Sequence, residues 1–165
     1  MMVTMSLVSL VDRWAGFYQD STAAQVALQF LHIGGLMAAG GMALASDRAM
    51  LRIPVGDRSA RIAVLEAQRG IHALVLAALT VVALSGAGFF LADRKTYWSS
   101  VPFWLKLSSV ALLVANGVWM LRLERTCTVS PHDDNPWRRL RVSARASVAL
   151  WFLTTLLGTV LGNAA

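Results

Sequence analysis

The stretch from residue 22 to residue 46, TAAQVALQFLHIGGLMAAGGMALAS, is apolar and has no formally charged residue. A helix that crosses a lipid bilayer needs about 20 mostly apolar residues, because each residue advances the helix by about 1.5 Å. Stretches of similar character follow at residues 70–92, 102–121 and 144–163. The sequence therefore predicts an all-α integral membrane protein, a four-transmembrane-helix bundle that forms a single domain over residues 1–165.

The composition supports this class of protein. Hydrophobic residues make up 56% of the chain and charged residues 15%, whereas soluble domains carry about 25% charged residues. The net charge of +6 comes from arginines in the connections between the apolar stretches. That distribution is typical of a topology signal, so we expect the lipid bilayer as partner and no nucleic acid.

The basic residues also predict an orientation. The connections at residues 47–69 and 122–145 hold eleven arginines, while the N-terminal segment and the connection at residues 93–101 hold only Arg13, Arg94 and Lys95. Basic connections stay on the cytoplasmic side of a membrane. We therefore expect a multi-pass protein of the bacterial cytoplasmic (inner) membrane with both termini outside, and the single cysteine, Cys127, as a free thiol in a cytoplasmic loop.

The N-terminal segment differs from a signal peptide, because its apolar run is short and ends at Asp12 and Arg13. Its pattern predicts a short amphipathic helix over residues 3–18 that lies on the membrane surface. Trp14, Phe17 and Tyr18 are suited to the interface between membrane and water.

The first apolar stretch carries polar residues on one helical face. Gln25, Gln29 and His32 share that face, and Leu36, Ala39, Ala43 and Asp47 continue it. Polar groups are costly in contact with lipid, so we expect the face to look into the bundle. The glycines of this stretch allow close helix packing, which would also suit a homo-oligomer or a larger membrane complex.

The other stretches add few polar groups. His72 stands near the start of the second stretch, which we expect to continue without a break from a helix over residues 60–69. The third stretch contains Lys106 and Asn116. Lys106 could reach back to the membrane surface as an anchor, or it could turn inward towards Asn116 and His32.

Three functions fit these residues. The first is a membrane-embedded redox protein that holds haem b or a metal ion, with His32 and His72 as metal ligands and Gln29, Lys106 and Asn116 near the cofactor. Simple helix placement sets the two histidines at different depths, so the pair would need single ligation or a shifted helix. The second is a carrier of small ions or protons, and the third is a non-catalytic accessory subunit of a larger complex.

The second helical hairpin adds a resemblance. Residues 85–117, SGAGFFLADRKTYWSSVPFWLKLSSVALLVANG, together with LHIGGL at residues 31–36, resemble the copper-resistance CopD domain and related four-helix families of the bacterial inner membrane, including HemJ-like proteins. The resemblance implies a haem-associated site with a histidine and a lysine, carried here by His32 and Lys106. On this basis we expect a haem- or metal-associated redox protein.

Overall fold

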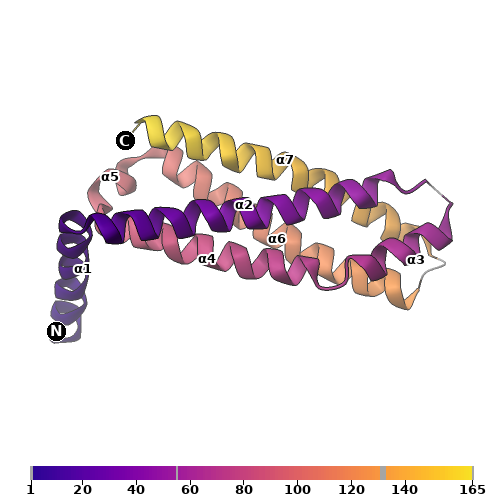
Figure 1. Ribbon diagram of the computed structural model, residues 1–165, viewed down its shortest axis with the longest axis horizontal. Coiled ribbons are helices and arrows are strands. Elements are labelled where there is room, and N and C mark those ends of the chain that lie inside the picture. Colours follow the sequence, from indigo (N-terminus) through magenta and orange to yellow (C-terminus); the bar gives the residue numbers. More distant parts are fainter. Residues whose placement is uncertain (1, 55, 131–132, 165) are drawn as a thin grey trace.

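The computed structural model describes residues 2–54, 56–130 and 133–164, and these residues form helices with short connections (Figure 1). In chain order the helices are α1 (Met2–Asp20), α2 (Thr22–Arg52), α3 (Arg58–Ala67), α4 (Ile71–Ala92), α5 (Arg94–Ser99), α6 (Val101–Val129) and α7 (Asp134–Ala164). Four of them, α2, α4, α6 and α7, are long and apolar enough to cross a membrane. The predicted all-helical class with four candidate spans is therefore confirmed.

The four long helices form an elongated bundle with two distinct ends. Both termini, α1 and α5 lie at one end, which we name the α1 end, and α3 lies at the other, which we name the α3 end (Figure 1). Within the bundle α2 packs along α4, α6 packs along α7, and α2 also packs against α7. The contact between α2 and α7 joins the two helix pairs.

The long helices extend past the predicted spans at the α3 end. The first span was expected to end near residue 46, but α2 continues to Arg52, and α6 continues to Val129 instead of ending near residue 121. The fourth helix begins at Asp134, well before residue 144. Hydropathy marks where an apolar stretch ends, whereas backbone hydrogen bonding continues through charged residues that favour helix.

The expected continuous helix from α3 into α4 is wrong. The chain breaks at Gly70, whose φ of 86° lies in the left-handed region that glycine adopts without steric cost. Before the break, α3 contacts both α2 and α6. Gln68, just before the break, is buried there.

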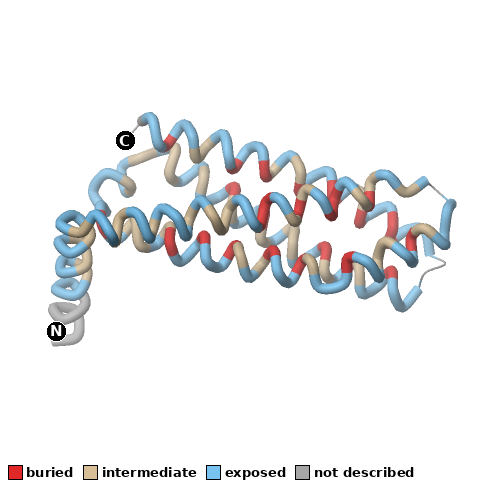
Figure 2. Tube along the Cα trace, viewed as in Figure 1, coloured by how far each residue is buried: buried red, intermediate tan, exposed pale blue. Residues whose placement is uncertain are grey.

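Buried positions recur along the long helices (Figure 2), and the buried apolar side chains form two clusters. We name the first the apolar layer; its members are Ala39, Ala43, Val75, Leu79, Leu113 and Trp151. The second cluster lies nearer the α3 end and consists of Met50, Met120, Leu123, Cys127, Trp137, Leu140 and Ala144. Cys127 is thus a buried residue of α6, and the prediction that it lies in a loop is wrong.

Glycines set the close approaches between helices. A Cβ on Gly35 would lie 2.9 Å from Cγ2 of Val82 on α4, and a Cβ on Gly40 would lie 3.3 Å from the Trp151 ring on α7. The neighbouring Gly34 and Gly41 have nothing within 4 Å of such a Cβ. Only one member of each glycine pair is therefore required by packing.

Helix α1 crosses the bundle end at a steep angle to the long helices (Figure 1). The Trp14 indole donates a hydrogen bond of 2.9 Å to the Gly88 carbonyl, and Arg94 pairs with Asp12 at 2.8 Å. Val8 and Phe17 are more than half exposed. Helix α1 thus contacts the bundle through Trp14 and Asp12 and exposes apolar side chains elsewhere, as a helix that lies on a membrane surface does.

The two adjacent glycines of α2 give a matched test of the packing. We expect Gly35→Ala to lower the free energy of unfolding by about 1–3 kcal/mol, because the added methyl group collides with Val82. Gly34→Ala adds the same methyl group in open space and should be neutral or stabilising by up to about 1 kcal/mol. Thermal unfolding in mild detergent measures both, and equal effects would contradict the observed α2–α4 packing.

Candidate functional site

The polar residues inside the bundle lie at two levels, one on each side of the apolar layer. Near the α3 end, three helices contribute a titratable side chain to one cluster: Asp47 from α2, His72 from α4 and Glu124 from α6. We name these three residues the titratable cluster. Their convergence depends on the helix extensions, because Asp47 and Glu124 lie beyond the apolar stretches that the sequence marks.

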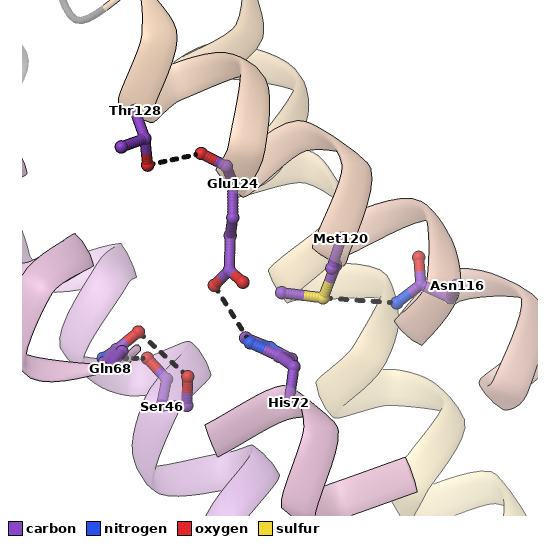
Figure 3. Close-up of polar contacts among 7 residues, drawn as sticks. All are labelled: Ser46, Gln68, His72, Asn116, Met120, Glu124 and Thr128. Carbon is purple, nitrogen blue, oxygen red and sulfur yellow. Dashed lines mark hydrogen bonds and ion pairs between the residues drawn. The ribbon is translucent and has the colours of Figure 1, made fainter. Parts of the chain in front are cut away.

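The closest contact in the titratable cluster joins imidazole and carboxylate. Nδ1 of His72 lies 2.9 Å from Oε1 of Glu124, and the two side chains are 5% and 18% exposed (Figure 3). An imidazole and a carboxyl group can each hold a proton. The contact can therefore share and pass on a proton.

Asp47 is the most deeply buried member of the titratable cluster. Its residue is 0% exposed, and neither carboxylate oxygen makes a hydrogen bond of good geometry with a residue that the structure describes. Ser147 of α7, His72 and Glu124 all act on it electrostatically. Burying a carboxyl group with few hydrogen bonds lowers the stability of the fold. Residues that lower stability in this way are often found at functional sites.

Neutral polar groups beside the titratable cluster are paired with one another. The Ser46 hydroxyl donates to Oε1 of Gln68 at 2.9 Å, and the Gln68 amide donates back to the Ser46 carbonyl at 3.1 Å (Figure 3). Asn116 donates to the Ser143 carbonyl at 3.1 Å and accepts from the Ser143 hydroxyl at 2.6 Å. These hydrogen bonds connect different segments of the bundle. The side chains at this level that can gain or lose a proton are those of the titratable cluster.

A small cavity lies beside His72. It has a volume of about 20 Å³, and its lining includes His72 and Ser147 as well as Leu79, Leu113 and Trp151 of the apolar layer. A water molecule needs roughly 10–15 Å³ and two or more polar partners. The cavity is large enough for one water molecule, and His72 and Ser147 are the residues with polar side chains in its lining.

His32 lies at the second level, towards the α1 end. Its Nδ1 is 3.1 Å from the Val82 carbonyl oxygen and 3.0 Å from Oγ of Ser85, and the Ser85 hydroxyl is 2.8 Å from the Val81 carbonyl, to which it donates. A carbonyl only accepts, so Nδ1 carries the hydrogen and Nε2 of the neutral ring keeps a lone pair. This tautomer is the one found in metal-bound histidines.

Lys106 turns inward at the same level. The residue is half-buried, and its Nζ would lie 3.5 Å from a Cβ added to Gly158 of α7. Its charge acts on His32 across the bundle. The structure thus packs the Lys106 side chain against α7, close enough to His32 for its charge to act on the imidazole.

The two histidines belong to different levels. Val82 and Ser85, the partners of His32, follow His72 on α4 by 10 and 13 residues, a separation of about 15–20 Å along the helix. His32 and His72 therefore cannot ligate one metal ion in this arrangement. Asn116 pairs with Ser143 on α7.

Gln29 does not face the bundle interior and is exposed. The buried positions of α2 begin at Ala39, since the helices cover α2 less closely towards the α1 end. The sequence pattern gives the direction of a face, but it does not say how far along the helix a neighbour covers that face.

Asp47 and Glu124 are the functional candidates that the sequence analysis did not select. Asp47 continues the His32 face at helical spacing, and Glu124 follows Asn116 and Met120 at steps of four residues. This spacing could have identified both residues as inward-facing. They were not selected because they lie in segments that were assigned to the basic connections between spans.

No group of three or more His, Cys, Asp or Glu side chains with metal-binding geometry occurs among the described residues. No family model matches the sequence, and no curated protein or solved structure is significantly similar to it.

Proposed function

We propose that the protein transfers protons in the bacterial inner membrane, with the titratable cluster as its proton-binding site. The single observation that carries this proposal is the convergence of buried Asp47 and His72 with half-buried Glu124, from three different helices. Ionisable groups inside a membrane protein are expensive and commonly mark ion or proton pathways. Two carboxyl groups around an imidazole form a relay in which each group can accept the proton of its neighbour.

The second level supplies the other half of a proton path. His32 with Ser85, and Lys106 beside it, lie on the far side of the apolar layer from His72. The buried hydroxyls of Ser109 and Thr154, 2.6 Å apart, join α6 to α7. In this conformation the apolar layer separates the two levels, so transfer between them requires water or a small movement of the helix pairs.

Proton flux tests the proposal directly. In proteoliposomes with an internal pH dye, a potassium gradient and valinomycin, the wild-type protein should speed proton entry over protein-free vesicles. Glu124→Gln and Asp47→Asn keep the side-chain shapes but remove the acidic protons, so we expect each to lower the flux about 100-fold or more.

Glu66→Gln provides the matched control, because Glu66 is exposed on α3 and the substitution changes the net charge in the same way. It should retain wild-type flux. Thermal unfolding of every variant separates a lost relay from a lost fold. A wild-type protein that conducts no faster than empty vesicles, or a control that loses as much flux as Glu124→Gln, would falsify the proposal.

The orientation that we propose keeps both termini outside and places the α3 end in the cytoplasm, as the arginine distribution indicates. Because Cys127 is buried, it is unsuitable as a reporter and should be replaced by alanine. In that background a cysteine at exposed Ser130 should react with a membrane-impermeant thiol reagent only in opened cells, and a cysteine at exposed Ser99 should react in spheroplasts. The reverse pattern would invert the orientation.

A haem- or metal-associated redox function is the second candidate. It is favoured by the hydrogen bond that fixes Nδ1 of His32 and leaves Nε2 free as a ligand, with Lys106 at the same level. These are also the two residues to which the CopD- and HemJ-like resemblance assigns the site. The geometry supports a one-histidine site at this level, without His72.

The visible absorption spectrum of the protein purified in mild detergent tests this candidate. A bound haem should give a Soret band that His32→Ala removes and that His72→Ala retains, because the two residues lie at different levels. A folded, colourless and metal-free preparation would rule out the redox candidate, and it would leave the proton-transfer proposal to its own test.

A further inference from the structure

A groove of about 240 Å³ lies on the outside of the bundle, between α6 and the start of α7. Its lining includes Trp119, Arg122 and Thr126 of α6 and, around the start of α7, Asp133, Asn135 and Arg139. Pockets for whole small molecules measure about 300–1,000 Å³. This groove is therefore sized for a head group or a small anion.

The two arginines of the groove have free guanidinium groups. Neither Arg122 nor Arg139 forms an ion pair or side-chain hydrogen bond with another residue that the structure describes, and both are exposed. Buried or half-buried arginines nearby differ, since Arg61 pairs with Asp134 and Arg141 donates to backbone carbonyls. The groove thus presents unused donors of the kind that bind phosphate in a bidentate manner.

Asp133 is the one acidic residue in the lining. Its Oδ1 accepts a hydrogen bond of 2.9 Å from the Asn135 backbone N–H, so this oxygen is engaged at the start of α7. Two guanidinium groups against one carboxylate leave a net positive lining. The charge balance favours an anion.

The groove lies where the apolar surface of α6 ends. Leu112, Val118 and Trp119 are exposed on the helix before Arg122, and Trp119 itself lines the groove. In a membrane this apolar surface would lie among acyl chains, while a tryptophan followed by arginines is typical of the level of the phosphates. An amphiphilic ligand would contact both parts, whereas a free anion would use only the arginines.

We infer that this groove binds the phosphate head group of an anionic phospholipid, with Arg122 and Arg139 holding the phosphate and Trp119 contacting the first part of the acyl chains. Basic pockets between membrane helices bind anionic lipids through the same combination of charge and apolar surface. The site is separate from the titratable cluster and does not depend on proton transfer.

Lipid binding to the purified full chain in mild detergent tests the inference. Native mass spectrometry and thermal unfolding should both detect phosphatidylglycerol in preference to zwitterionic phosphatidylcholine. Arg122→Gln and Arg139→Gln should each weaken phosphatidylglycerol binding by roughly five- to tenfold. Both residues are exposed, so the variants should unfold at the wild-type temperature when no lipid is added.

Arg125→Gln and Arg138→Gln are the matched controls. Each removes one exposed arginine from the same helix as its counterpart, outside the groove lining, and each should bind within about twofold of wild type. Equal losses in the controls would indicate general charge attraction and overturn the site. Complete displacement of the lipid by millimolar inorganic phosphate would reassign the groove to a free anion, and equal binding of both lipids would overturn the inference as well.

Discussion

The contact between Trp151 and Gly40 holds the two halves of the bundle together. Helices α2 and α4 form one pair, α6 and α7 form the other, and the large indole of α7 lies against Gly40 of α2, where a Cβ would come within 3.3 Å of the ring. The same indole belongs to the apolar layer and lines the small cavity beside His72. Trp151 therefore takes part in the packing between the helix pairs, in the apolar layer and in the surroundings of the titratable cluster.

The sequence predicted the architecture well because lipid imposes a simple rule on the chain. A backbone in an apolar medium must satisfy its own hydrogen bonds, so four long apolar stretches predict four long helices. Ser147, Trp151 and Thr154 recur at steps of four and three residues, which places them on one helical face, and all three are buried. The ends of α2 and α6 and the start of α7 were not predicted, because Asp47, Glu124 and Arg139 lie outside the apolar stretches and are still helical.

The site was predicted only in part for the same reason. His32 and Lys106 occupy one level, as an inward lysine would require, and His72 lies apart from them. The partners of His72 come from charged segments that a hydropathy argument treats as connections. At Gly70 the prediction failed in the other direction, because a helix ends where an unbroken one was expected. The composition of this stretch favours a continuous helix, but Gly70 adopts a positive φ and interrupts it. Tertiary contacts between distant segments, such as Ser46 with Gln68, have no signature in the local pattern.

The apolar layer also affects how a membrane voltage would be distributed across the protein. A transmembrane voltage falls mainly across the part of a protein that contains no mobile charge, water or polar group. In the proposed membrane orientation that part lies between the His72 level and the His32 level, about 15–20 Å apart along α4, so the field there would be steeper than across a uniform bilayer. A charge that crosses the whole membrane gains or loses about 2.3 kcal/mol for every 100 mV, and most of that energy would be exchanged within the few residues around Leu79, Leu113 and Trp151. The side chains that fill this layer therefore determine how strongly the membrane voltage acts on the two polar levels.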